Sequence, residues 1–249
     1  MEIENYFSNR ATVRDYSDRE VSNEVINGIL EKAMRAPTCG NMQLYSVVVT
    51  RDNTNKEKLA ALHFNQPAAT GSNLILTICA DFNRFSRWCE LSEASPCYSN
   101  FHSFIMAATD AIIYAQQIVT IAELEGLATC YLGTVNYTAK EISDLFLLPE
   151  LVVPVASLSI GYPTDAPPVK TERLPLEAIV HLEHYRKDSD KEIKSLFKTK
   201  EEWPDNKRFV KENDKKTLAQ VFTDIRYPLK TNETVSQTFI NLLQEKGFI

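Results

Sequence analysis

The sequence predicts an α+β fold, and three observations support this prediction. Short runs rich in β-branched and apolar residues, bounded by polar residues, predict strands at 44–50, 73–80, 129–133 and 154–161. Apolar residues at helical spacing predict helices between and around these runs. The strands and helices do not alternate strictly, which disfavours a doubly wound parallel sheet.

The predicted helices follow from local start and stop signals. Ser22 suits the N-cap of the first helix, which Pro37 ends. A long apolar helix from His102 to Glu125 is expected to form the spine of the core, and its polar residues indicate a buried helix rather than a membrane span. Thr138 and Glu141 are spaced as a capping box that opens a short helix.

The end of the chain is first charged and then apolar. From Arg186 to Lys216 charges of both signs are dense, which is typical of a solvated face or a mobile excursion. A terminal helix is predicted by apolar residues at helical spacing, namely Val235, Phe239, Leu242 and Leu243. We expect this helix to pack on another surface, such as that of a second subunit.

Composition argues against several function classes. The 249 residues are 44% hydrophobic and 24% charged, as in an ordinary globular protein. The net charge of −6 disfavours nucleic acid or an anionic membrane as the main partner. The 7 glycines lack the spacing of a dinucleotide loop or a P-loop, so side chains are expected to hold any phosphate. The 5 cysteines form no C-x-x-C pair and no signal peptide opens the chain, which predicts reduced thiols in the cytoplasm.

The first candidate site is the segment from Arg10 to Arg14. In an extended segment Arg10, Thr12 and Arg14 point to one face, and two guanidinium groups with a hydroxyl suit a phosphate dianion. The alternative is a pair of surface arginines in weak ion pairs with Asp15 or Glu20, and spacing alone favours it.

The second candidate is the loop at 36–43. The side-chain amides of Asn41 and Gln43 suit a flat heterocycle with an imide edge, and Gly40 would let the backbone approach a ligand closely. An ordinary helix-to-strand loop is the alternative and is favoured for the loop alone. Gln66, a lone polar residue before a proline, has the same alternative.

Weaker candidates lie further along the chain. Gly133 marks either close approach of a ligand or an ordinary strand end. Lys170 and Arg173 form a second pair of cations, although most loop cations bind no phosphate. His181 and His184 could share a helix face, but no third metal ligand is evident.

In order along the chain, these pieces resemble the nitroreductase family of FMN-dependent oxidoreductases. Within it, the sequence is most similar to the oxygen-insensitive NADPH nitroreductases and flavin reductases. The resemblance covers about residues 5–185. It rests on Arg10–Arg14, APTCGNMQ at 36–43, Gln66, CADFNR at 79–84, GLATCYLG at 126–133, LPE at 148–150, IGYP at 160–163 and VKTERLP at 169–175.

The resemblance implies a mixed sheet flanked by helices in an intertwined homodimer, with FMN at the dimer interface. Residues 1–185 would form the FMN-binding domain, and 186–249 would be an excursion and terminal helix of the same fold. The phosphate would be held by Arg10, Thr12, Arg14, Lys170 and Arg173. The ribityl chain and ring would be contacted by Thr38, Cys39, Gly40, Gln43 and Gln66, and lined by Tyr131, Leu132 and Gly133.

The implied activity is ping-pong hydride transfer from NADPH or NADH, through FMN, to a small-molecule acceptor such as a nitroaromatic, a quinone or a flavin. The chain needs no acid or base for this reaction, so no catalytic residue is predicted. Arg226 is the candidate for the NADPH ribose phosphate, and its alternative is a surface ion pair with Asp224. The alternative functions are a specialised or non-turnover flavin-binding relative and, less favoured, a metal- or thiol-dependent enzyme.

Overall fold

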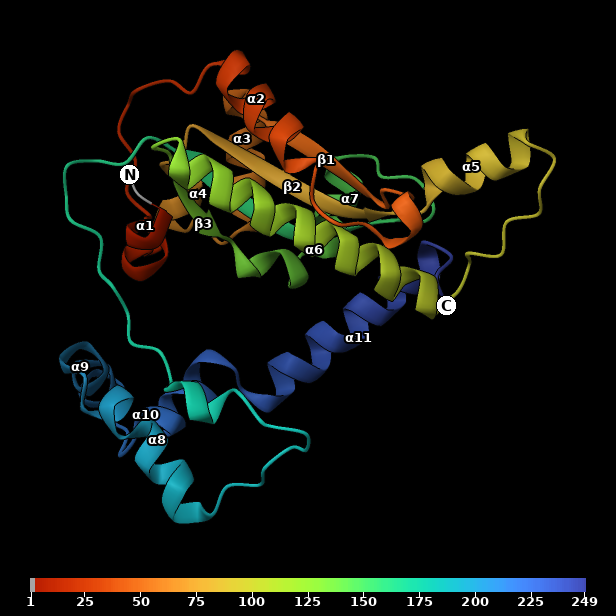
Figure 1. The fold of residues 1–249 in the computed structure, drawn as a ribbon. Helices are drawn as coiled ribbons and strands as arrows, with labels where there is room; N and C mark the ends of the chain where they lie inside the picture. The colour runs from red at the N-terminus through yellow and green to blue at the C-terminus, as the bar shows by residue number, and fades with distance from the viewer. Residues whose placement is uncertain (1–2) are drawn as a thin grey trace. The chain divides into compact units, whose positions relative to one another are not determined.

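The computed structural model describes residues 3–249 and confirms the α+β class (Figure 1). Its described strands form one sheet in the order β1-β2-β4-β3. All four predicted strands are present, with ends that differ from the prediction by only a few residues. Their bounds are Tyr45–Thr50 for β1, Leu74–Asp81 for β2, Ala128–Tyr131 for β3 and Val152–Gly161 for β4.

The strand pairing differs from the mixed sheet that was expected. Within the described part of the chain, β1 with β2, β2 with β4 and β3 with β4 are all antiparallel. The β2–β4 register shifts between Ile78 and Cys79, where Pro154 lies opposite Cys79. Proline has no N–H to donate, so an irregularity at this point of a central strand is expected.

Helices cover both faces of the sheet. The α-helices up to residue 145 are α1 (Ile3–Asn9), α2 (Asn23–Ala33), α3 (Asn53–Leu62), α4 (Pro67–Thr70), α5 (Asn83–Leu91), α6 (Phe101–Leu124) and α7 (Ala139–Leu145). Short helical turns occur at η1 (Cys39–Asn41) and η2 (Gly133–Asn136). The later elements are η3 (Leu176–Ala178), α8 (Asp190–Glu202), α9 (Pro204–Glu212), α10 (Leu218–Val221), η4 (Phe222–Arg226) and α11 (Leu229–Glu245).

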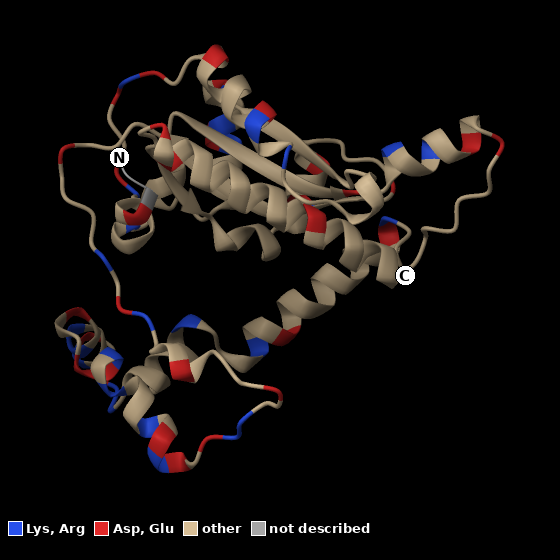
Figure 2. Cartoon of the chain, viewed as in Figure 1, with Lys and Arg blue, Asp and Glu red and all other residues tan. Residues whose placement is uncertain are grey.

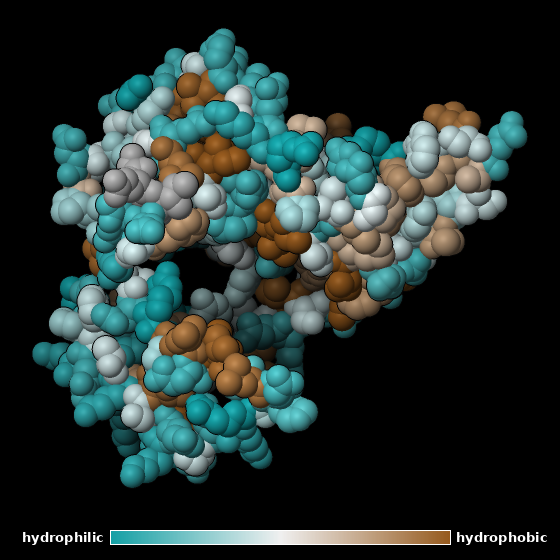
Figure 3. Space-filling view, in the orientation of Figure 1, coloured by the Kyte–Doolittle hydropathy of each residue, from teal (hydrophilic) through white to brown (hydrophobic). Residues whose placement is uncertain are grey.

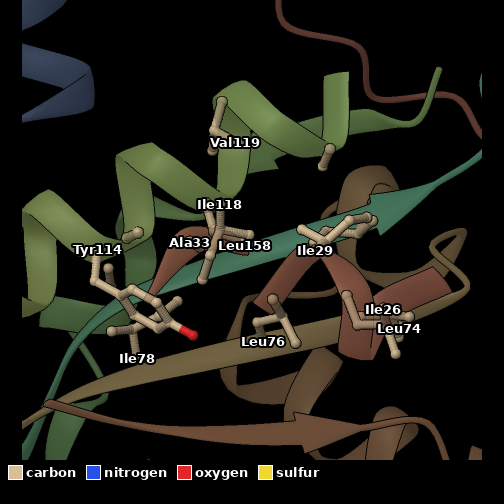
Figure 4. Packing of buried hydrophobic residues seen from close by; sticks show 14 of the residues in the cluster. Ile26, Ile29, Ala33, Leu74, Leu76, Ile78, Tyr114, Ile118, Val119 and Leu158 are labelled. Carbon is tan, nitrogen blue, oxygen red and sulfur yellow. The ribbon is translucent and has the colours of Figure 1, made fainter. Parts of the chain in front are cut away.

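The main core lies between the sheet and the α2 and α6 helices. Figure 4 shows Tyr114 and Ile118 of α6 beside Ile78 of β2 and Leu158 of β4. Among residues 3–249, α6 is the one helix long and apolar enough to cross a membrane. Its inner face is buried in this core, which agrees with the predicted core helix.

The local signals for helix ends gave mixed results. The Ser22 hydroxyl accepts a hydrogen bond from the N–H of Val25, which confirms the predicted N-cap. The capping box predicted at Thr138 is wrong. Its hydroxyl donates to the carbonyl oxygen of Leu62 at 2.9 Å instead of accepting from the first turn of α7. A carbonyl brought in by the tertiary fold thus replaced the local partner.

The chain forms two compact units. The main unit contains the residues up to Val169 together with Val235–Ile249, and the inserted unit is Lys170–Thr234. The charged segment that was expected to be a solvated face or an excursion forms α8 and α9. Figure 2 shows charges of both signs on these two helices, whereas α6 is nearly uncharged.

Candidate functional site

A buried carboxylate holds the loop between α2 and β1. Asp110 of α6 is 3% exposed and accepts a hydrogen bond from the hydroxyl of Thr38. It also accepts from the backbone N–H groups of Cys39 at 3.0 Å and Leu44 at 3.3 Å. The Thr38 oxygen in turn accepts from the N–H of Gln43 at 2.9 Å. Both ends of this loop, residues 38–44, are therefore fixed to one side chain of the core.

The same loop has an unusual backbone. Gly40, Asn41 and Gln43 all lie in the left-handed region, with φ of 53°, 57° and 55°. Glycine and asparagine adopt this region at low cost, but Gln43 stores strain there, and such strain is commonly found at binding sites.

Arg84, from the CADFNR motif, supports this loop from the other side. Its Nη2 donates to the carbonyl oxygens of Gln43 at 2.7 Å and Tyr45 at 3.0 Å. Its Nη1 donates to Asp81 at 3.3 Å, in the same motif. Arg84 thus joins the end of the loop and the start of β1 to α5.

The arginine segment is tied to α6 by a second acid. Arg10 donates through Nε and Nη2 to the two carboxylate oxygens of Glu123, both at 3.1 Å. Tyr6 and Thr129 also donate to Glu123, at 2.8 and 2.5 Å. Burial, followed by the hydrogen bond to Glu123, raises the pKa of Tyr6 to about 12. The expected alternative, in which Arg10 pairs with Asp15 or Glu20, is wrong, because the partner comes from a distant helix.

The rest of this segment lies against β3 and β4. Tyr16 shares a hydrogen bond of 2.7 Å with the hydroxyl of Ser159. Arg14 is exposed and Thr12 is half-buried. Burial raises the pKa of the Cys130 thiol, and the charges of Arg14 and Arg10 partly oppose this rise. The charges of the two predicted phosphate ligands, Arg10 and Arg14, therefore both affect Cys130 of β3.

A cavity of about 140 Å³ opens beside Arg10. Its lining includes Tyr6, Arg10, Val13, Glu123 and Pro163.

Gln66 and the 131–133 segment also lie close together. The side-chain amide of Gln66 donates to the Thr134 hydroxyl at 3.1 Å, so the residue next to Gly133 is its partner. Leu132 is buried and its N–H donates to Ser157 at 2.9 Å. A Cβ built on Gly133 would meet nothing within 4 Å, so the space in front of this glycine is open. Tyr131 is partly exposed beside it.

Three predicted cations belong to the inserted unit, namely Lys170, Arg173 and Arg226. Arg173 donates to the hydroxyl of Thr171 at 2.7 Å. Arg226 lies over the ring of Phe209, 4.7 Å from its centroid.

The expected alternative for Arg226, an ion pair with Asp224, is wrong. Asp224 instead pairs with Lys215 at 2.9 Å. The stacked guanidinium of Arg226 is exposed.

The metal alternative gains no ligand set from the structure. Within residues 3–249, no group of three His, Cys, Asp or Glu side chains is placed to hold a metal ion. His181 instead accepts from the N–H of Arg186, and its ring lies 4.4 Å from that of Tyr185 at a tilt of 35°. The five cysteines are all free thiols.

Sequence reasoning missed Asp110 and Glu123 as site residues. Each is an acid in an otherwise apolar helix, and that is the signal that could have identified them. Their partners are 72 and 113 residues away in the chain, so the sequence could not show what they bind.

Comparison with known proteins identifies the family. The profile of the nitroreductase family matches residues 7–89. The Cr(VI) reductase of Pseudomonas sp. strain G-1 is 30% identical over 229 residues, covering 91% of this chain and 94% of that protein. The FMN reductase [NAD(P)H] of Bacillus subtilis is 30% identical over 233 residues, covering 91% and 93%. A crystal structure from Bacteroides fragilis superposes with a TM-score of 0.96 and 44% identity, covering 98% of this chain and 99% of that one. With two relatives of this similarity over nearly their full lengths, the chain belongs to the nitroreductase family.

Proposed function

We propose that this protein is an FMN-dependent NAD(P)H oxidoreductase that reduces small acceptors such as nitroaromatics, quinones or flavins. The observation that carries the proposal is the similarity, over nearly the whole chain, to proteins named Cr(VI) reductase and FMN reductase. The geometry adds support, because two acids of α6 hold part of the predicted flavin contacts in place: Asp110 holds the loop at 38–44 and Glu123 holds Arg10.

The residues present fit a flavin mononucleotide. Open space in front of Gly133 would accept a flat ring. The strained loop at Gln43 leads into β1, at the opposite edge of the sheet from β3 and Gly133, so the two sets of predicted contacts are not brought together within one chain. Glu123 takes the Nε and Nη2 donors of Arg10, which orients the guanidinium and leaves Nη1 for a phosphate. We assign the ring and ribityl contacts to Thr38, Cys39, Gly40, Gln43, Gln66, Tyr131, Leu132 and Gly133.

We assign the phosphate to Arg10, Thr12 and Arg14 of the main unit. We give Lys170 and Arg173 the same role on the basis of the family resemblance. When bound, FMN accepts a hydride from the nicotinamide and passes electrons to the acceptor. The chain contributes binding and orientation, and no side chain is assigned as an acid or base.

Arg226 is our candidate for the NADPH ribose phosphate. Stacking over Phe209 holds its guanidinium at the surface, and the neighbouring acid Asp224 is paired with Lys215 instead. This would give a preference for NADPH over NADH.

We also propose that the protein is a homodimer. α6 exposes a stripe of apolar side chains at helical spacing, Phe101, Ile105 and Ile112, each 45–52% exposed. Figure 3 shows further brown patches on the inserted unit, whose exposed apolar residues include Leu176 and Ile179. Sedimentation at micromolar concentration should give twice the 28.3 kDa chain mass, and an active monomer would refute the proposal. We also propose a cytoplasmic location, because the five cysteines are free thiols and the cytoplasm keeps thiols reduced.

The first experiment is to identify the cofactor. The purified protein should be yellow, and heat should release FMN, as identified by chromatography. The yellow protein should then oxidise NADPH in the presence of a quinone or a nitroarene, which separates an enzyme from a flavin-binding relative without turnover. Recovery of FAD, or no flavin after reconstitution, would overturn the proposed function.

A further inference from the structure

A fully buried histidine lies under the proposed flavin contacts. His63, at the end of α3, is 0% exposed, and its Nδ1 is 2.7 Å from the hydroxyl oxygen of Thr134. Its Nε2 is buried and has no hydrogen-bond partner among residues 3–249. Burial lowers the pKa of His63 to about 4, so the ring is neutral near pH 7. A neutral ring carries one donor nitrogen and one acceptor nitrogen.

The surroundings determine which nitrogen carries the proton. A proton on Nδ1 is donated to Thr134 and leaves Nε2 as an unpaired acceptor. A proton on Nε2 would leave a buried, unpaired N–H, which is the rarer situation in folded proteins. His63 is therefore expected to be the Nδ1–H tautomer and to donate to Thr134.

Thr134 also accepts a hydrogen bond from Gln66. The Gln66 Nε2 donates to the Thr134 hydroxyl oxygen at 3.1 Å. With both lone pairs of this oxygen occupied, the hydroxyl proton of Thr134 is left for a third group. Thr134 is half-buried and follows Gly133, in front of which the space is open.

Gln66 is fixed by the same histidine. Its Nε2 donates a second proton to the backbone carbonyl oxygen of His63 at 3.1 Å. Phe64 and Asn65, between the two residues, both have left-handed backbones, with φ of 56° and 50°, and this tight turn brings the two residues together. Both amide protons of Gln66 are thus used within the chain, which leaves Oε1 as an acceptor for a ligand.

We propose that His63 is a positioning residue that fixes, through Thr134 and Gln66, one hydrogen-bond donor and one acceptor toward a bound flavin ring. The inference rests on the proposed function. The imide edge of a flavin carries carbonyl acceptors beside an N–H donor. A hydroxyl donor on Thr134 and an amide acceptor on Gln66 match that pattern. Without the ring of His63, the Thr134 hydroxyl could turn its proton inward, and Gln66, although still held by the backbone carbonyl of His63, would lose a fixed acceptor.

The test is a double-mutant cycle in the full-length protein with His63→Phe, Thr134→Val and both changes. FMN affinity is measured by fluorescence titration, and the absorption spectrum of bound FMN is recorded. Each single change should raise the Kd for FMN by about 2- to 10-fold, the loss of a neutral hydrogen bond, and should shift the visible bands. The double variant should bind FMN no more weakly than the weaker-binding single variant, because both changes remove the same His63–Thr134 hydrogen bond.

Two further variants separate positioning from packing. His63→Asn keeps a side-chain N–H and should restore most of the affinity and the wild-type spectrum. His102→Phe makes the same change as His63→Phe at an exposed histidine and should have no effect. In a form of the test that needs no variant to fold, ¹⁵N NMR of the wild-type imidazole should show His63 protonated at Nδ1.

Three results would overturn the inference. They are full additivity of the two changes, an unchanged spectrum in His63→Phe, and protonation of the wild-type ring at Nε2. If wild-type protein failed to bind FMN, the proposed function would fall and this inference with it. Normal FMN binding with unaffected variants would overturn the inference alone.

Discussion

Replacing Asp110 with alanine should be among the most destabilising single changes in the main unit. The carboxylate is 3% exposed and accepts three hydrogen bonds, from the Thr38 hydroxyl and from the N–H groups of Cys39 and Leu44. A hydrogen bond to a charged group contributes about 1.5–3 kcal/mol, so three independent bonds would sum to about 5–9 kcal/mol. Because they share one carboxylate they are not additive, and we expect a loss of about 3–5 kcal/mol.

Urea unfolding measures this loss directly. For an m value of about 3 kcal/mol per M, the Asp110→Ala midpoint should fall by about 1 M or more with m unchanged. Asp110→Asn keeps the size but turns one acceptor oxygen into a donor, so its midpoint should lie between those of wild type and Asp110→Ala. Asp165→Ala, in an exposed loop, is the matched control and should change little. A midpoint for Asp110→Ala within about 0.2 M of that control would refute the reasoning.

Four other predictions follow from the same contacts. Arg14→Ala should weaken FMN binding about 10- to 100-fold in a fluorescence titration, as for loss of a hydrogen bond to a charged group. Lys187→Ala should have no effect on FMN binding, and equal effects of the two changes would show that Arg14 is only a surface charge. Glu123→Gln should lower the free energy of unfolding by about 1.5–3 kcal/mol, because it breaks a largely buried ion pair; a urea midpoint equal to wild type would contradict this. Arg226→Ala should raise the KM for NADPH and leave that for NADH nearly unchanged, and an equal rise for both donors would remove the assignment. The pKa of His63 is 6.5 in the unfolded chain and about 4 in the folded chain, so the unfolded chain binds the proton first as the pH falls. The contribution of His63 to stability is therefore complete above pH 6.5 and is lost as the pH falls toward 4. Between these two pKa values the free energy of unfolding should change by about 1.4 kcal/mol per pH unit because of His63. Urea unfolding at pH 7 and pH 5 should show this loss of stability in the wild type and not in His63→Phe.

Much of the fold could be predicted because its signals are local. The N-cap at Ser22 depends on residues within one turn, and the predicted strands depend on short apolar runs with polar ends. Thr138 shows where this reasoning fails. Its hydroxyl had a good local partner by sequence, but the fold offered the carbonyl of Leu62, 76 residues away, and that contact prevailed.

The candidate site could be predicted only in part. The motifs pointed to Gln43, Gln66 and Arg10 through a family resemblance, and the structure shows what holds these residues in place. The supporting acids Asp110 and Glu123 and the clamp formed by Arg84 depend on long-range pairing, which spacing along one chain does not encode. The acceptor and the nucleotide preference depend on surfaces that a local pattern does not describe.

The segment Val235–Ile249, which follows the inserted unit and belongs to the main unit, has a consequence for synthesis of the protein. Leu243 and Phe248 are buried with Phe82 and Phe104 in one cluster, and the N–H of Leu151 donates to the carbonyl of Lys246 at 2.9 Å. The ribosome must therefore make the whole inserted unit before the main unit can close, which takes several seconds at roughly 5–20 residues per second. During that interval the nascent chain keeps aromatic core surface open to water. Closure of the main unit therefore follows synthesis of the inserted unit, and a chain released early, after Thr234, would expose this core surface to chaperones and proteases.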